Sequence, residues 1–171
     1  KSTPIRLNAI PKKGYKFVGW KVGGTTVSTD EEYKLTITAS TTVEAVFQTR
    51  TTESGLYFNE VMAANSSTIQ NENLKYEDWF EIYNSSSAPI NLAGLYLSDD
   101  PATPLKYKIP YGTPDSTTIP TKGYIVFWAD NESQDGPLHC PFKLDKSGDT
   151  LILSQVSSSG TVTTLDRLTY V

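Results

Sequence analysis

The chain has 171 residues, of which 37% are hydrophobic and 20% are charged, so it can form a folded core and is not an intrinsically disordered chain. Residues 1–50 carry 8 Lys and Arg against 4 Asp and Glu, a net charge of +4, whereas residues 51–171 carry 7 against 15, a net charge of −8. The larger part therefore repels phosphate, so we expect no nucleic-acid partner. No apolar run approaches the roughly 18 residues of a membrane-spanning helix, so we expect no transmembrane segment.

Short segments of alternating polar and apolar residues in the first 48 residues predict a small all-β domain. The predicted strands cover residues 4–10, 15–22, 33–38 and 42–47. Gly23-Gly24 supplies the positive φ angles of a tight hairpin turn. The nearby lysines, Lys12 and Lys13 among them, could form a basic patch, but we interpret them as a solvated face.

The segment Gly14-Tyr15-Lys16-Phe17-Val18-Gly19-Trp20, followed by a closing strand at 42–47, resembles the divergent internalin-B-type B-repeat of bacterial surface proteins. Tyr15, Phe17 and Trp20 are expected to supply the main apolar mass of this domain, which we place at residues 1–48. The resemblance implies a spacer or adhesive module and not an enzyme.

Residues 49–55 have no apolar periodicity and are predicted to form a linker. Beyond it, short strands with turn residues between them predict a sandwich of two antiparallel sheets. The segment 78–84 is typical of this pattern, because Phe80 and Ile82 point to one face while Trp79 and Tyr83 point to the other. The other predicted strands cover residues 56–65, 90–100, 105–110, 124–129, 142–144, 150–154 and 162–171. The run 124–129 is the most apolar in the chain and is therefore predicted to be a central strand.

Five blocks of this second part, residues 56–171, resemble in order the bacterial branch of the lamin tail domain, an immunoglobulin-like module. They are Phe58-Asn59-Glu60-Val61-Met62, Asp78-Trp79-Phe80-Glu81-Ile82-Tyr83-Asn84, residues 92–100, residues 123–130, and residues 138–149. Leu95 stands where the pattern more often has Trp, and Cys140-Pro141 replaces a small polar pair. The resemblance implies an immunoglobulin-like antiparallel β-sandwich.

Catalytic residues are scarce. The chain has one His, His139, and one Cys, Cys140, so a Ser or Cys hydrolase and a four-ligand zinc site are not expected. We interpret Cys140 as a buried small hydrophobe and His139 as hydrogen-bonded to loop backbone. Acids such as Glu60, Asp78 and Glu81 could serve glycoside hydrolysis only in a deep cleft, for which a small sandwich has little room. We therefore predict that the chain is not an enzyme.

Two features are weak candidates for binding sites. The first is a set of acidic side chains in turns that offer oxygen ligands to calcium: Asp99, Asp100, Asp130, Glu132 and Asp135. Acidic turns are more commonly solvated, so we expect no cofactor. The second is a set of aromatic side chains on the face opposite the core, Trp79, Tyr83 and Tyr96. These could stack on a sugar or a partner protein, but we expect the loop 65–76 or the small domain to cover them.

The sequence therefore predicts a non-catalytic interaction or architectural module of a bacterial surface or secreted protein. Its partner would be a protein, a cell-envelope glycan or a neighbouring domain. Two alternatives stay open: a carbohydrate-binding module, recognised by an exposed aromatic stripe around Trp79 and Tyr96, and an accessory domain of a secreted hydrolase or kinase-like enzyme. We expect the chain to be a piece of a longer protein. Its ligand, its oligomeric state and the rigidity of the linker do not follow from the sequence.

Overall fold

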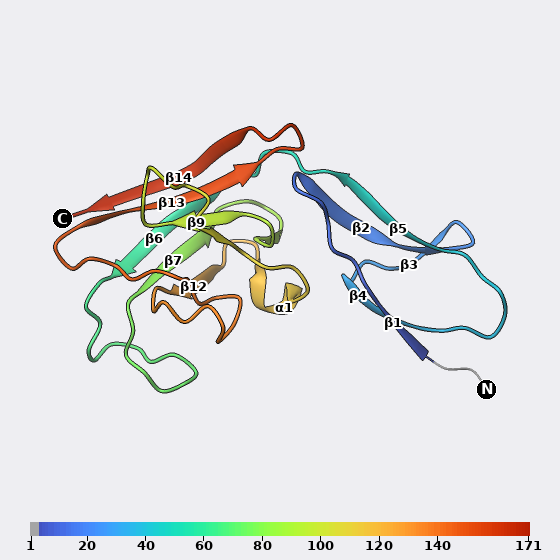
Figure 1. Cartoon of the computed structure of the whole chain (residues 1–171), viewed down its shortest axis with the longest axis horizontal. Coiled ribbons are helices and arrows are strands. Elements are labelled where there is room, and N and C mark those ends of the chain that lie inside the picture. Colours follow the sequence, from blue (N-terminus) through green and yellow to red (C-terminus); the bar gives the residue numbers. More distant parts are fainter. Residues whose placement is uncertain (1–3) are drawn as a thin grey trace.

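The computed structural model describes residues 4–171, which form two β domains joined by a short connection (Figure 1). The small domain contains β1 (Pro4–Asn8), β2 (Tyr15–Val22), β3 (Thr25–Ser28), β4 (Glu32–Thr36) and β5 (Val43–Thr49). The larger domain contains β6 (Leu56–Met62), β7 (Trp79–Asn84), β8 (Ile90–Asn91), β9 (Tyr96–Ser98), β10 (Tyr107–Lys108), a four-residue helix α1 (Pro114–Thr117), β11 (Thr118–Ile119), β12 (Tyr124–Trp128), β13 (Asp149–Val156) and β14 (Val162–Tyr170). All of the strand pairs are antiparallel, which confirms the predicted all-β class.

The small domain has a two-stranded sheet, β1-β4, and a three-stranded sheet, β3-β2-β5. Phe17 lies 5.3 Å from Trp20 and 5.7 Å from Phe47, measured between ring centroids, so these three rings form its apolar centre. Of these rings Trp20 is buried, whereas Phe47 is 39% exposed, and Tyr15, also predicted to supply this apolar mass, is 38% exposed. The sequence also missed β3, because its four residues include only one large apolar side chain, Val27.

The larger domain is a sandwich of the three-stranded sheet β12-β7-β6 and the four-stranded sheet β10-β9-β13-β14, supplemented by the short pair β11-β8. In Figure 1, β13 and β14 run alongside β6, and β14 contacts β6 directly. Leu95 and Leu97 are fully buried between the sheets.

The centre of the sandwich is a cluster of phenylalanine rings around Phe80 of β7. Its ring stacks on Phe127 at 5.6 Å and on Phe142 at 6.4 Å, and it meets Phe58 edge-on at 5.7 Å. Phe80 and Phe127 have no exposed surface. Four segments that are distant in the sequence therefore depend on a single side chain.

Two of the strand predictions were wrong. The central strand of its sheet is β7, and the apolar run at 124–128, β12, lies at the edge of the ladder. The residues of β12 are apolar because both faces of the strand are covered at its C-terminal end, where Phe127 is 0% and Trp128 is 8% exposed. Residues 142–144 form no strand and contribute only a single bridge, between Lys143 and Asp130.

The Phe80 cluster yields a stability prediction. Replacing Phe80 with Ala removes a fully buried ring with three aromatic neighbours, so we expect a loss of about 3–5 kcal/mol in the free energy of unfolding. Urea denaturation followed by tryptophan fluorescence measures this loss. Thr163→Ala, at an exposed position of β14, serves as the control and should change the unfolding free energy by less than about 0.5 kcal/mol. A comparable change in both variants would contradict this account of the core.

Candidate functional site

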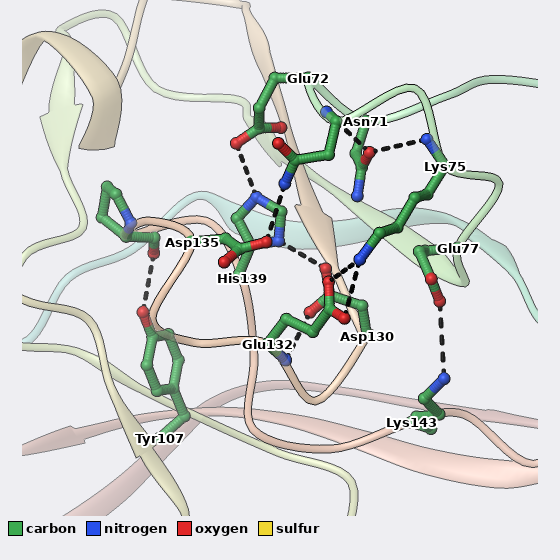
Figure 2. Close-up of polar contacts among 12 residues, drawn as sticks. Asn71, Glu72, Lys75, Glu77, Tyr107, Asp130, Glu132, Asp135, His139 and Lys143 are labelled. Atoms are coloured by element: carbon green, nitrogen blue, oxygen red, sulfur yellow. Dashed lines mark hydrogen bonds and ion pairs between the residues drawn. The ribbon is translucent and has the colours of Figure 1, made fainter.

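A buried polar cluster surrounds His139, on the connection that follows β12 (Figure 2). This connection turns back beside β12, since the Trp128 N–H donates to the Leu138 carbonyl and the Cys140 N–H donates to the Trp128 carbonyl. These two bonds bring the His139 ring next to Asp130, and their side chains are 1% and 0% exposed. The cluster is therefore built by backbone pairing at the outer edge of β12.

Both ring nitrogens of His139 contact carboxylates. Nδ1 lies 2.5 Å from Asp130 Oδ2, and Nε2 lies 2.8 Å from Glu72 Oε1. Burial alone would lower the pKa of His139, but the hydrogen bonds and negative charges of Asp130 and Glu72 outweigh burial, so the pKa is raised above its ordinary 6.5. For Glu72, burial alone would raise the pKa. Hydrogen bonds from its own backbone N–H and from His139, together with the charge of His139, outweigh burial and hold the pKa of Glu72 below its ordinary value.

This arrangement holds two loops together. Glu72 belongs to the long connection between β6 and β7, and its neighbours also reach the loop after β12. Lys75 Nζ lies 2.7 Å from Glu132 Oε2, and the Asn73 amide donates to Asp135 at 2.8 Å. Figure 2 shows these contacts bridging the same two loops. The prediction that His139 is hydrogen-bonded to loop backbone was wrong, because its two ring nitrogens contact the carboxylates of Asp130 and Glu72.

The cluster lacks the parts of a hydrolytic site. A general base needs one imidazole nitrogen free to accept a proton from a nucleophile, whereas both nitrogens of His139 are hydrogen-bonded to carboxylates. Cys140 is fully buried, as predicted, and burial raises the pKa of its thiol well above the ordinary value, which keeps it protonated. The chemistry available here is therefore electrostatic attachment of loops.

The five calcium candidates each have a different role in the structure. Asp130 binds His139, Glu132 binds Lys75, Asp135 accepts from Asn73, Asp99 lies 2.5 Å from Lys106 Nζ, and Asp100 accepts hydrogen bonds from the turn residues Ala102 and Thr103. Within residues 4–171 no three His, Cys, Asp or Glu side chains are grouped so that they could hold a metal ion.

The three aromatic candidates also separate. Trp79 is only 6% exposed, Tyr83 is half-buried, and Tyr96 belongs to β9 in the opposite sheet. The exposed stripe around Trp79 and Tyr96 that would mark a carbohydrate-binding module is therefore not formed. Sequence reasoning missed two exposed tyrosines that do lie beside Tyr83, Tyr57 on β6 and Tyr124 on β12, because only the strand register places them there.

A second site that the sequence missed is the junction between the domains, which centres on Arg50. Its guanidinium donates to the carbonyls of Ala93 and Asn91 at 2.5 and 2.6 Å and to Glu53 at 3.0 Å. Its backbone N–H donates to the Gly14 carbonyl at 2.8 Å, and its side chain is only 7% exposed. One residue thus binds the small domain, the connection and the sandwich.

Further contacts hold the same junction. The Gln155 side chain accepts from the Glu53 N–H and donates to the Thr51 carbonyl, both at 2.8 Å. The buried Glu31 of the small domain accepts from the Gly112 N–H of the sandwich at 2.8 Å. Gly14, at a φ of +75°, lies so close to the Ser158 backbone that a Cβ would overlap it. Residues 50–55 are therefore fastened to both domains.

The His139 cluster predicts a pH dependence of stability. A raised pKa in the folded state means that the stabilisation is complete below about pH 6.5, the ordinary value, and is lost as pH rises through the raised pKa. For Glu72, whose pKa is lowered, stabilisation is present above its ordinary 4.5 and is lost as pH falls through the lowered pKa. The free energy of unfolding should therefore decline as pH rises above about 6.5, and it should decline less in His139→Gln.

Urea denaturation across this pH range measures that slope. Asn73→Ala is the matched control, because it removes the hydrogen bond from the Asn73 amide to Asp135 between the same two loops. Its unfolding free energy should change with pH as in the unmodified chain. An equal slope in His139→Gln would show that another group is responsible.

Comparison with protein-family models gives two matches in order along the chain. Residues 1–51 match the Divergent InlB B-repeat domain, and residues 49–171 match the Lamin Tail Domain. Neither a search of curated proteins nor a search of solved structures returned a significant match. Both matched families are non-enzymatic modules, and the second is immunoglobulin-like, so the two predicted resemblances and the fold are confirmed. Within the residues described, no helix has the length and apolar character needed to cross a membrane. The Lamin Tail Domain match covers well over half of the 171 residues of the chain. The chain therefore belongs to the lamin tail domain family, with a divergent InlB B-repeat domain preceding the lamin tail domain.

Proposed function

We propose that this chain is an architectural and interaction module of a bacterial surface or secreted protein, in which the B-repeat domain is held at a set orientation against the lamin tail sandwich. The observation that carries the proposal is the Arg50 junction. A spacer that only tethers two domains needs no specific contacts, whereas here a guanidinium that is 93% buried is satisfied by both the connection and the sandwich.

The energetics of burial favour this reading. The Arg50 side chain forms its hydrogen bonds to Asn91 and Ala93 only when the sandwich is docked beside the connection, so these bonds select that arrangement. The Glu31 and Gln155 bonds act in the same direction from two other sides. Relative motion of the domains would have to break all of these contacts together.

The surface location is supported by the B-repeat match, since such repeats resemble modules of bacterial surface proteins. The partner would be a protein, a cell-envelope component or a neighbouring domain of the same polypeptide. The carbohydrate-binding alternative loses its support, because the aromatic stripe it requires is divided between two sheets and Trp79 is buried. Turnover of a substrate by the isolated chain would overturn the non-catalytic reading.

A distance measurement between the domains tests the proposal. Spin labels at Lys34→Cys on β4 and Thr163→Cys on β14 report the interdomain distance by pulsed electron resonance, and the buried Cys140 should not react. We expect a narrow distance distribution in the unmodified chain and a clearly broader one in Arg50→Ala. Arg6→Ala is the matched control, because Arg6 pairs with Glu32 at an exposed position within the small domain, and it should leave the distribution narrow. A broad distribution in the unmodified chain would overturn the proposed function.

A further inference from the structure

A row of three tyrosines crosses the outer face of the β12-β7-β6 sheet. The strand register places Tyr57 of β6 and Tyr124 of β12 directly opposite Tyr83 of β7. Tyr57 is 48% and Tyr124 is 53% exposed, and the rings of Tyr83 and Tyr124 stack with centroids 4.8 Å apart. At the other end of the same sheet the corresponding row includes Trp79 and Trp128, which are buried. Only the tyrosine end of this face is open.

Two carboxylates lie next to the tyrosine row without a cation. Glu60 and Glu81 occupy opposite positions on β6 and β7, where like charges destabilise a sheet. Glu81 accepts one hydrogen bond, from the Asn59 amide at 2.7 Å, and neither Glu forms an ion pair with any residue in the 4–171 range. We call the three tyrosines together with Glu60 and Glu81 the acidic face.

The geometry of this face selects the chemistry of its partner. Because Tyr83 and Tyr124 stack on each other, one side of each ring is already occupied, which leaves little flat aromatic surface for a sugar ring. The carboxylates and phenolic oxygens accept hydrogen bonds, and the domain as a whole has a net charge of −8 over residues 51–171. The complementary partner is apolar and rich in cationic donors.

The small domain of the same chain carries a surface with those properties. Ile10, Lys12, Tyr15 and Phe47 line a shallow groove of about 360 Å³, and Ile10 is 69% exposed. Lys13 is exposed beside it, and residues 1–50 have a net charge of +4. We call these five residues the basic groove.

We propose that the basic groove of one copy docks on the acidic face of a second copy, so that the chain associates head to tail. Lys12 and Lys13 would neutralise Glu60 and Glu81, while the exposed apolar side chains of the groove cover the tyrosine row. The two surfaces differ, so the contact is heterologous and can extend into an open string of copies. This inference rests on the proposed function, because it names the partner of the same module.

Sedimentation velocity over a range of protein concentrations tests the inference. The unmodified chain should associate, and added salt should weaken the association because the charges are at the surface. Two charge-reversed variants make the test specific: Glu60→Lys/Glu81→Lys alters the acidic face, and Lys12→Glu/Lys13→Glu alters the basic groove. Each variant alone should have its association weakened at least tenfold.

An equimolar mixture of the two variants should associate again. The native groove of the first meets the native face of the second, and the reversed groove of the second carries Glu opposite the Lys residues of the reversed face. Asp115→Lys, an exposed charge reversal on α1, is the matched control and should associate like the unmodified chain. If a reversed variant fails to fold, Tyr124→Ala at the edge strand tests the same face and should also weaken association.

An unmodified chain that remains monomeric at every concentration, or a mixture that forms no complex, overturns the inference. The interdomain distance measured on the same samples separates the two proposals. A monomer with a narrow distance distribution overturns self-docking alone, whereas a broad distribution overturns the proposed function.

Discussion

The strand β7 is the constraint on which the rest of the sandwich depends. Its period of two sends Phe80 and Ile82 into the core, where both are fully buried. The same period sends Trp79 and Tyr83 to the outer face, where the first is buried and the second belongs to an open row. β7 pairs with β6 on one side and with β12 on the other. Each residue of β7 therefore lies between two neighbours, one from each strand, that point to the same face of the sheet.

Polar contacts, and not further apolar surface, fasten the parts that this core does not reach. His139 and Glu72 join the connection between β6 and β7 to the loop after β12, and Arg50 joins the two domains. The His139 ring and the Arg50 guanidinium are buried and surrounded by acceptors, whereas Glu72 is exposed, so each buried group selects the arrangement in which its hydrogen bonds form. Their role is positional, which agrees with the non-enzymatic character of both matched families.

A module of this kind acts through its surfaces. The acidic face on the sandwich and the basic groove on the small domain lie on different domains, so the junction at Arg50 determines how far apart they are and in which directions they point. A rigid junction would therefore make a head-to-tail string regular, whereas a flexible one would cost entropy at every contact. The orientation of the domains and the proposed self-association are linked in this physical sense.

The sequence by itself determined the all-β class, the order of the two domains, the inward-facing residues of β7, and the burial of Cys140. Alternation and turn residues are local properties, and so they can be recognised without knowing what a segment contacts. It did not determine that β12 lies at the edge, because an apolar run records burial and not position in a ladder. It also grouped Tyr96 with Tyr83 and overlooked Tyr57 and Tyr124, since a shared face depends on which strands become neighbours.

Only the tertiary structure decided the partners of the polar side chains. Arg50 lies 41 and 43 residues before the carbonyls that it binds, and His139 lies 67 residues after Glu72. Such contacts leave no periodic signal, because a single residue at each end suffices to make them. The contacts of residues 50–53 with both domains therefore could not be recognised in a segment without any apolar pattern.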